Sequence, residues 1–456
     1  MIRSVFIISS NGGEVLIEKH YRGSTPRAVV DFFWDAVLAS PRREDVPPVL
    51  VAPKYYLMNV YRNKLYFLAI VAGEVPPGLV FEMLHRIVDI FDDYFGTSAP
   101  KTKTGGNNTV SKADEFRMKE NFSTVYQLLE EFMDNGFPFI TEPNQLKAMV
   151  APPSFGKRLI GAVTGGLAGR QVAETLAQGM LSNMPWRKSN AKYTQNEIYF
   201  DIVEEIDCII GENGRPIYVD VRGSIQVNCR LSGLPDLELN FEDPSMMSGP
   251  SFHPCVRLKR FEQDHTVSFV PPDGRFELMT YRATRRFTQI PCPIYCKPQI
   301  GFGRQHDLSD GQAPMRVHIS VMVGPKPMKG IESGTHVKDP KAEDIVVQIP
   351  MPARTLSCNL EANHGKVVTD EVAKQCKWII GRVPKEKSPH LKGDLRLPPN
   401  SLPGDNALGV ELSFKVPSYA LSGVKVERLE LVRPSTYKPY KGVRYITRAG
   451  RFQIRC

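Results

Sequence analysis

The feature that most limits the fold is a long region without any long helical pattern, which extends from Tyr193 to the end of the chain. Segments in this region alternate apolar and polar residues or are rich in β-branched residues, and Gly, Pro and Asn separate them. These segments are 197–207, 215–233, 265–282, 315–324, 343–352, 409–416 and 424–432. The 37 prolines of the chain fit this interpretation, because proline disrupts helix interiors but is tolerated in turns and at sheet edges. The region therefore predicts an all-β domain built from one or two β-sandwiches.

The first 140 residues follow a different pattern, which predicts a small α/β domain. Residues 1–20 predict a hairpin rather than a signal peptide, because only about six apolar residues precede a polar turn at 11–13. Asn135 and Gly136 are expected to end a helix before Pro138. The predicted elements are helices at 28–38, 80–95 and 115–134, a second hairpin at 55–71, and a polar surface loop at 97–115.

Residues 141–190 change character, with many glycines, small or basic side chains, and few large apolar ones. This composition predicts a flexible linker between a domain at 1–140 and a domain at 191–456. The formal charge is −2 in the first domain, +4 in the linker and +7 in the second domain, which together give the net charge of +9. A basic surface suits an anionic membrane or nucleic acid, although a solvated basic face is the commoner explanation.

The sequence lacks the motifs that several functional classes require. No P-loop, GxSxG, HExxH or paired CxxC motif occurs, and GFGR at 301–304 opens no predicted helix, so it is not a dinucleotide-binding loop. Cys292 and Cys296 have no histidine pair nearby and predict two strand thiols rather than a zinc site. The basic runs at 256–261 and 282–287 are explained by exposed strands, so they do not require an RNA-binding function. We therefore expect no enzymatic activity, cofactor, metal or nucleic-acid partner.

Two further observations concern the compartment. No stretch approaches the ~18 uncharged apolar residues of a membrane span, so any membrane association is expected to be peripheral. The eight cysteines are scattered and absent from the first 200 residues, which predicts reduced thiols rather than a disulfide framework. Both observations favour a cytoplasmic protein.

Segments along the whole chain, in the same order, resemble the medium (mu) subunits of the clathrin-adaptor protein complexes. They are MIRSVFIISSNGGEVLIEKHYRG at 1–23, LLEEFMDNGFP at 128–138, NMPWRKSNAKYTQNEIYFDIVEEID at 183–207, LSGLPDLELNF at 231–241, SFHPCVRLKRFEQDHTVSFVPPDGRFELMTYR at 251–282, LSGVKVERLEL at 421–431 and YKGVRYITRAGRFQIRC at 440–456. Within this family, EVPPGLVFEMLHRIVDIFDDYFG at 74–96 and the ending YKPYKGVRYITRAGRFQ make the chain similar to the mu subunits of adaptor protein complex 3. The resemblance covers nearly the whole chain apart from the 97–115 loop, much of the linker and the stretches near 325–345 and 385–408.

The resemblance implies an α+β protein, with an N-terminal longin-like α/β domain followed by an all-β mu homology domain made of two β-sandwich subdomains. It implies a heterotetrameric vesicle coat, in which the first domain docks on a large beta-type adaptin and the other partners are a delta-type adaptin and a small sigma subunit. The implied function is non-enzymatic sorting on Golgi, endosomal and vesicle membranes towards the lysosome or vacuole. The second domain would bind a tyrosine, two arbitrary residues and a bulky hydrophobic residue in the cytosolic tails of cargo. A structural or assembly subunit with a vestigial peptide pocket is the alternative.

The predicted strand at 197–207 supplies the candidate site, since Tyr199 and Asp201 point to one face and Ile198 and Phe200 to the other. The resemblance implies that Tyr199 packs on the ring of the cargo tyrosine and that Asp201 accepts its phenolic hydrogen. It implies that Arg444 packs against the same ring and donates to its oxygen. The hydrophobic pocket is assigned in the same way to Val426, Leu429 and Val443, with Ile198 and Phe200 lining or supporting it.

Two positions depart from the family pattern. Asn228 stands where plasma-membrane adaptors have a lysine near the hydroxyl, and Gly442 stands where they have a tryptophan beside the arginine. These departures predict a tyrosine pocket that is shallower and less cationic. Without the flanking motifs, Tyr199, Asp201 and Arg444 would be read as a strand aromatic beside a surface ion pair.

Overall fold

The computed structural model divides by its internal contacts into two compact units, Met1–Lys188 and Ser189–Cys456. The residues that the structure describes are 1–96, 113–150, 184, 186–187, 189–284, 292–302, 315–326, 340–352, 354–371, 374–383, 388–398, 409–432 and 437–455. Most of the predicted 97–115 loop and most of the predicted linker lie outside these ranges. Within them, no helix is both long enough and apolar enough to cross a membrane.

The N-terminal unit is built on a five-stranded antiparallel sheet with the order β2–β1–β5–β4–β3. The strands are β1 (Ile2–Ser9), β2 (Val15–His20), β3 (Val49–Ala52), β4 (Tyr55–Arg62) and β5 (Leu65–Val71). Both predicted hairpins are confirmed, β1 with β2 and β4 with β5. Asn63 and Lys64 between β4 and β5 both have positive φ, as a tight hairpin loop requires.

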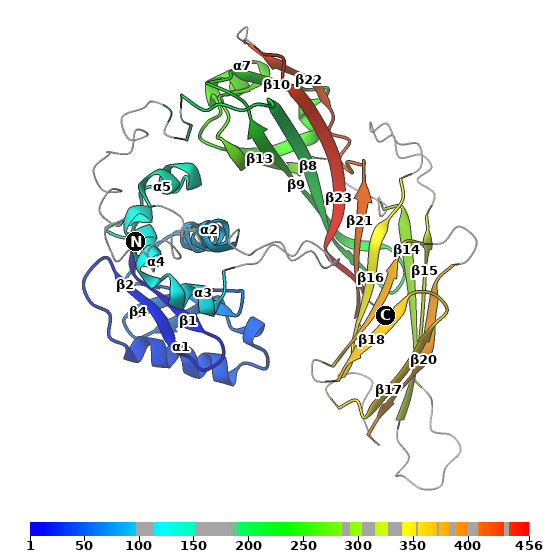
Figure 1. Ribbon diagram of the computed structural model, residues 1–456. Coiled ribbons are helices and arrows are strands. Elements are labelled where there is room, and N and C mark those ends of the chain that lie inside the picture. Colours follow the sequence, from blue (N-terminus) through cyan, green and yellow to red (C-terminus); the bar gives the residue numbers. More distant parts are fainter. Residues whose placement is uncertain are drawn as a thin grey trace, which may run out of the picture. The chain divides into compact units, whose positions relative to one another are not determined.

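Helices cover both faces of this sheet, because consecutive residues of each strand point into different cores (Figure 1). α1 (Ala28–Ala39) packs with Phe6 and Leu68 on one face. α2 (Pro77–Phe95) packs with Val5 and Phe67 on the other face, together with residues from the helices that follow it. The short helix η1 (Arg43–Asp45) precedes β3. The unit therefore has three layers, with the sheet in the middle.

The predicted helix at 115–134 is two shorter helices, α3 (Glu115–Glu120) and α4 (Phe122–Phe132), which meet at Asn121. The predicted end is also wrong, since a small hairpin of β6 (Met133–Asp134) and β7 (Phe137–Pro138) follows α4. Asn135 and Gly136 form its turn, with φ values of 49° and 78° that suit a two-residue hairpin loop rather than a helix cap. The Gly136 carbonyl accepts a hydrogen bond from the Ile2 N–H at 3.3 Å, which ties this turn to the start of β1.

α5 (Pro143–Met149) lies within the segment predicted to be a flexible linker, and for these residues the prediction is wrong. Leu146 is fully buried and joins the core that α2 and α4 form on the sheet. The Tyr94 hydroxyl on α2 donates to the Val150 carbonyl at 3.1 Å, directly after the helix. The packed part of the N-terminal unit therefore continues at least to Val150.

The C-terminal unit contains a nine-stranded sheet in the order β11–β13–β9–β8–β23–β21–β16–β19–β18. Its strands are β8 (Glu197–Ile210), β9 (Pro216–Arg230), β11 (Met247–Phe252), β13 (Gly274–Ala283), β16 (Glu343–Pro350), β18 (Lys366–Asp370), β19 (Gln375–Gly381), β21 (Gly409–Pro417) and β23 (Tyr440–Arg455). β8 and β23 pair in parallel, whereas the other neighbours are antiparallel. β8, β9 and β23 lie side by side and run towards β21 and β16 (Figure 1).

Two smaller sheets pack on this long sheet, one near each end (Figure 1). One consists of β12 (Val267–Phe269), β10 (Leu237–Phe241) and β22 (Val426–Leu431), and the other of β14 (Ile294–Phe302), β15 (Met315–Pro325), β20 (His390–Leu397) and β17 (Ser357–Ala362). Phe200 and Phe269 meet edge to face in the first core, with centroids 6.5 Å apart. Trp378 is fully buried in the second core. The unit therefore consists of two sandwiches that share one sheet.

Candidate peptide-binding site

Parallel pairing of β8 with β23 brings the predicted tyrosine-pocket residues together from distant parts of the chain. Tyr199 lies opposite Gly442, and Asp201 lies opposite Arg444. The predicted faces are confirmed, because Ile198 and Phe200 are fully buried while Tyr199 and Asp201 are partly exposed. The tyrosine-pocket candidates therefore share the outward face of the long sheet.

Asp201 and Arg444 form a two-pronged ion pair across the two strands. The Arg444 Nε donates to Asp201 Oδ1 and the Arg444 Nη2 donates to Asp201 Oδ2, each at 2.7 Å. This hydrogen bonding and the charge of Asp201 raise the pKa of Arg444 above its usual value. The Arg444 side chain is 67% exposed, and an ion pair so accessible to water contributes only ~0–1 kcal/mol to stability. The pair is thus available to a ligand that both donates to a carboxylate and accepts from a guanidinium.

Tyr199 occupies the space above Gly442. A Cβ atom at position 442 would lie 2.7 Å from Tyr199 Cδ1, so the absence of a side chain there admits the ring. The Tyr199 hydroxyl donates to Glu197 Oε2 at 3.1 Å, and partial burial together with this contact raises the pKa of Tyr199. The Tyr440 ring lies 5.6 Å from the Tyr199 ring, centroid to centroid.

Tyr440 is a site residue that the sequence reasoning missed. It is 63% exposed, and it belongs to the face of β23 that also carries Gly442 and Arg444. The sequence carries a signal, because Tyr440 precedes Gly442 by two residues and alternate residues of a strand share a face, but no strand was predicted there. The backbone at Gly442 is therefore covered by the Tyr199 ring, and the Tyr440 ring packs next to that of Tyr199.

The hydrophobic-pocket candidates lie on the opposite face, between β23 and β22. Val426, Leu429 and Val443 are all partly buried. The neighbours of Val443 along β23 contact the β22 backbone: Lys441 Nζ donates to the Leu429 carbonyl at 2.5 Å, and the Val426 N–H donates to the Tyr445 hydroxyl at 2.9 Å. Ile198 and Phe200 are in the core and support this pocket rather than line it.

The part of β23 that carries the site has an open edge. β8 pairs with β23 from Tyr440 onwards, but β21 pairs on the other side only from Ile446 onwards. β21 ends at Pro417, and Ser418 after it has a φ of 57°, which turns the chain away. No strand in the described ranges pairs with 440–445 on this side. The N–H of Tyr440 bonds to the Asn196 carbonyl, so by strand alternation the backbone groups of residues 441, 443 and 445 point to the open edge.

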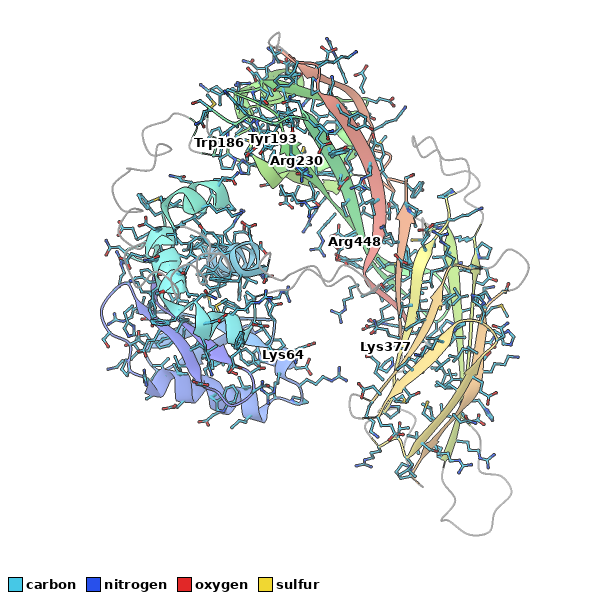
Figure 2. The ribbon with its side chains drawn as sticks, viewed as in Figure 1. Lys64, Trp186, Tyr193, Arg230, Lys377 and Arg448 are labelled. Carbon is cyan, nitrogen blue, oxygen red and sulfur yellow. The ribbon has the colours of Figure 1, made fainter. Side chains whose placement is uncertain are left out.

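Other ion pairs flank the tyrosine pocket along β8. Arg230 contacts Glu197 at 3.4 Å before Tyr199, and Arg448 contacts Glu205 at 2.9 Å beyond Asp201. Figure 2 labels both arginines. Each arginine is paired with a carboxylate, so neither pair adds net charge, and Asn228, opposite Tyr199 on β9, adds none either.

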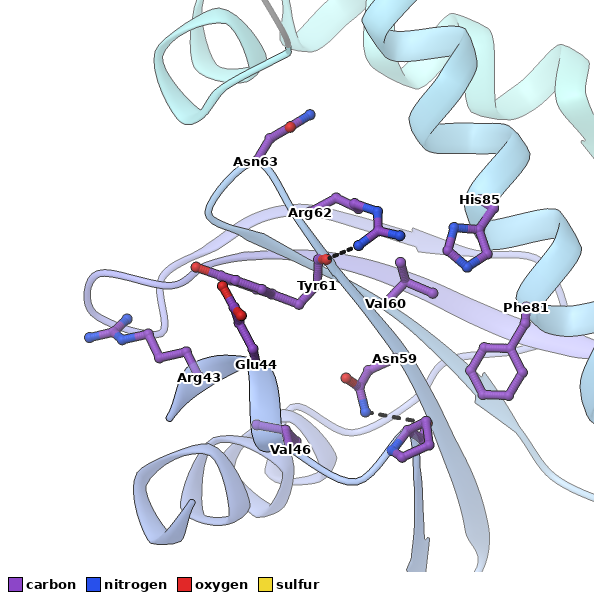
Figure 3. A pocket seen from close by; sticks show the side chains of 11 residues that line it. Arg43, Glu44, Val46, Asn59, Val60, Tyr61, Arg62, Asn63, Phe81 and His85 are labelled. Atoms are coloured by element: carbon purple, nitrogen blue, oxygen red, sulfur yellow. Dashed lines mark hydrogen bonds between the residues drawn. The ribbon is translucent and has the colours of Figure 1, made fainter. Parts of the chain in front are cut away.

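A separate cavity lies in the N-terminal unit and contains none of these residues (Figure 3). Its volume is about 530 Å³. Arg43, Arg62 and His85 line it together with Glu44 and the partly buried Phe81. Because it belongs to the other unit, it is not part of the predicted peptide site.

Comparison with known proteins shows the class of protein to which this fold and this site belong. Residues 184–456 match the model of the adaptor complexes medium subunit family. The chain belongs to this family, and it is therefore a non-enzymatic medium subunit of a coat adaptor.

The individual relatives confirm the resemblance to adaptor complex 3. The chain is 42% identical over 457 residues to "AP-3 complex subunit mu" of Dictyostelium discoideum and 38% identical over 455 residues to "AP-3 complex subunit mu-1" of Homo sapiens, with 100% of each chain covered. Its fold is similar to a chain of the "Homology model of the full-length AP-3 complex in an intermediate open conformation", with a TM-score of 0.56, 15% identity and 100% of both chains covered.

Proposed function

We propose that this medium subunit selects membrane cargo by binding a tyrosine, two arbitrary residues and a bulky hydrophobic residue. The observation that carries the proposal is the open edge of β23, which has the candidate tyrosine-pocket residues on one face of the sheet and the candidate hydrophobic-pocket residues on the other. An extended peptide can add to such an edge through main-chain hydrogen bonds, while its side chains enter pockets alternately on the two faces. Residues three apart in an extended peptide point to opposite faces. This spacing matches the tyrosine and the hydrophobic residue of the motif.

The charges of the outward face support recognition of a phenolic hydroxyl. Asp201 is placed to accept its hydrogen, and Arg444 is placed to donate to its oxygen. A phenylalanine in this position would leave both groups covered and without a ligand partner, which costs affinity. A phosphotyrosine would bring its negative charge to Asp201.

The expected affinity for one motif is weak. Burial of a tyrosine removes ~150–250 Å² of surface, or roughly 4–6 kcal/mol at about 25 cal/mol per Å². Association itself costs at least ~4 kcal/mol. Attachment to a membrane would then supply the necessary effective concentration. The basic linker and C-terminal unit support contact with anionic lipid, as part of the same proposal.

Exposed aromatic side chains of the N-terminal unit support docking on a large subunit. Phe116, Phe122, Phe137 and Phe139 are between 48% and 70% exposed and belong to α3, α4 and the segment of β7. The three-layered unit fits the longin-like domain that the resemblance implies. We assign it to a beta-type adaptin, with a delta-type adaptin and a small sigma subunit completing the complex. We also propose that the complex acts on Golgi and endosomal membranes, in transport to the lysosome or vacuole.

Isothermal calorimetry with the full chain tests the cargo proposal. A peptide with the tyrosine motif should bind with a dissociation constant of roughly 1–100 μM. The matched phenylalanine peptide should bind at least about tenfold more weakly, which corresponds to ~1.4 kcal/mol. The phosphotyrosine peptide should give no measurable heat. Equal binding of tyrosine and phenylalanine peptides would contradict the assigned pocket, and no binding of either would favour the assembly subunit with a vestigial pocket.

Substitution of Gly442 by alanine should weaken binding of the tyrosine peptide about tenfold, or ~1.4 kcal/mol. The new Cβ would lie 2.7 Å from Tyr199 Cδ1, so the ring must leave its place above position 442. Calorimetry with the same peptide measures the effect. Gly301→Ala is the control, because its Cβ would meet nothing closer than 3.9 Å. Unchanged affinity of the Gly442→Ala variant would show that the position of the Tyr199 ring is unimportant.

A further inference from the structure

A carboxylate lies in the core of the C-terminal unit, four residues after Phe200 on the inward face of β8. The Glu204 side chain is fully buried. Its Oε1 accepts from the Tyr281 hydroxyl at 2.8 Å and from the Ser422 hydroxyl. Its Oε2 accepts from the backbone N–H groups of Leu421 at 2.5 Å and Ser422 at 2.9 Å. All four of these donors are neutral groups, so a buried acidic residue is satisfied by dipoles rather than by a cation.

These contacts belong to one row of residues across four neighbouring strands. Tyr281 on β13 lies opposite Gly223 on β9, Gly223 lies opposite Glu204, and Glu204 lies opposite Thr447 on β23. A Cβ at Gly223 would lie 2.1 Å from Tyr281 Cζ, so Tyr281 crosses the bare backbone of Gly223 to reach the carboxylate. Burial, and next the charge of Glu204, raise the pKa of Tyr281 well above its ordinary value, so its hydroxyl remains a donor. We call Tyr281, Gly223, Glu204 and Thr447 the polar row.

The polar row holds the connector 418–425, which joins β21 to β22 and is not a strand. Thr447 Oγ1 donates to the Tyr419 carbonyl at 2.9 Å, and Glu204 accepts from Leu421 and Ser422 as described. The connector has positive φ at Ser418 (57°) and Gly423 (88°), and within it the Gly423 N–H donates to the Ala420 carbonyl at 3.3 Å and the Val424 N–H to Ser422 Oγ at 3.0 Å. It is nonetheless almost entirely buried from 419 to 424. The N–H groups of Leu421 and Ser422 and the carbonyl of Tyr419 are therefore the backbone groups that side chains of the sheet satisfy.

β22 begins directly after this connector and carries Val426 and Leu429 of the hydrophobic pocket. We propose that Glu204 is a positioning residue for that pocket: through the polar row it fixes the connector, and the connector fixes β22 against β23. This inference rests on the proposed function for the pocket's role in binding, but the coupling of Glu204 to β22 stands on the contacts alone. Glu204 sets specificity for the hydrophobic residue of the motif without touching the peptide.

Replacing Glu204 by glutamine keeps the shape of the side chain but turns one acceptor oxygen into an amide that donates. The amide can take the place of Oε1, where the Tyr281 and Ser422 hydroxyls can rotate to accept from it, and the remaining oxygen keeps the N–H groups of Leu421 and Ser422. The bonds then lose the charge of the carboxylate, and neutral hydrogen bonds are roughly half as strong, so the connector is held less tightly. Glu205→Gln is the matched control, since it makes the same exchange one residue further along β8. Glu205 points outward and pairs with Arg448 at 2.9 Å.

Hydrogen exchange of the full chain without peptide tests the coupling. Exchange of the amides of 419–431 should be at least tenfold faster in Glu204→Gln than in the wild type and unchanged in Glu205→Gln. Calorimetry then tests the effect on specificity. Preference for leucine over alanine at the third position after the tyrosine should fall at least fivefold in Glu204→Gln, while preference for tyrosine over phenylalanine should stay within twofold.

The proposal is overturned if the amides of 419–431 exchange at the wild-type rate in Glu204→Gln. It is also overturned if the variant loses the preference for tyrosine over phenylalanine as much as the preference for leucine over alanine. If the wild-type chain binds neither peptide, the proposed function fails, and the exchange result alone decides whether Glu204 fixes β22. If Glu204→Gln does not fold, Ser422→Ala removes one of the four donors and is measured in the same way, with the same outcomes deciding.

Discussion

Replacing Asp201 by alanine should lower the affinity of the full chain for a tyrosine-motif peptide at least about a hundredfold, or ~2.7 kcal/mol. The carboxylate is the group placed to accept the phenolic hydrogen, and it holds Arg444 in place through two hydrogen bonds of 2.7 Å. Without Asp201, a bound tyrosine would bury a hydroxyl without its acceptor beside a guanidinium that has lost its partner. Arg444→Ala should have an effect of similar size, because it removes the donor to the phenolic oxygen.

The measurement is isothermal calorimetry, with circular dichroism to verify folding. Glu205→Ala is the matched control, because the Glu205–Arg448 pair links the same two strands four residues further on, at 2.9 Å. It should leave the affinity within about threefold of wild type. The double variant Asp201→Ala/Arg444→Ala is decisive, since wild-type affinity in that protein would refute the site assignment altogether.

Gly136→Ala should destabilise the N-terminal unit by about 3 kcal/mol. Gly136 has a φ of 78°, which is unfavourable for any residue with a Cβ, and a Cβ there would lie 1.9 Å from the Ile2 carbonyl oxygen. The hairpin turn must therefore move away from β1 and lose the hydrogen bond to Ile2. Urea unfolding followed by hydrogen exchange and mass spectrometry resolves the N-terminal sheet separately.

Gly12→Ala is the control for this change. Gly12 lies in the turn between β1 and β2 of the same unit, its φ is not positive, and a Cβ there would meet nothing within 4 Å. It should leave the stability within about 0.5 kcal/mol of wild type. Equal stability of Gly136→Ala and Gly12→Ala would mean that the turn at Asn135 and Gly136 does not constrain the unit.

Much of the fold was predictable because strands and long amphipathic helices have a short-range signature. Alternation in 197–207 placed Ile198 and Phe200 on one face and Tyr199 and Asp201 on the other, as the structure has them. The helix predicted at 115–134 failed for a physical reason. Asn135-Gly136 is equally compatible with a helix end and a hairpin turn, and the contact of Gly136 with Ile2, over 130 residues away, favours the turn.

The candidate site was predictable only in part. The resemblance located Tyr199, Asp201 and Arg444, but strand pairing put them in register, and pairing partners more than 240 residues apart leave no local pattern. The open edge of β23 depends on where β21 stops, at Pro417, which no motif in β23 reveals. The role of Glu204 was likewise hidden, because one acidic residue in an alternating strand gives no sign of the connector that covers it.

The sheet that both sandwiches share joins them without a flexible connection in between. β8, β9 and β23, which are 14, 15 and 16 residues long, each pass without interruption from one sandwich to the other. Hydrogen bonding along these strands links the two sandwiches, with a shift of register in the β8–β23 pairing between Ala449 and Phe452. The two sandwiches are therefore expected to move as one body rather than about a hinge, because side chains of β8, β9 and β23 also belong to the core of the far sandwich.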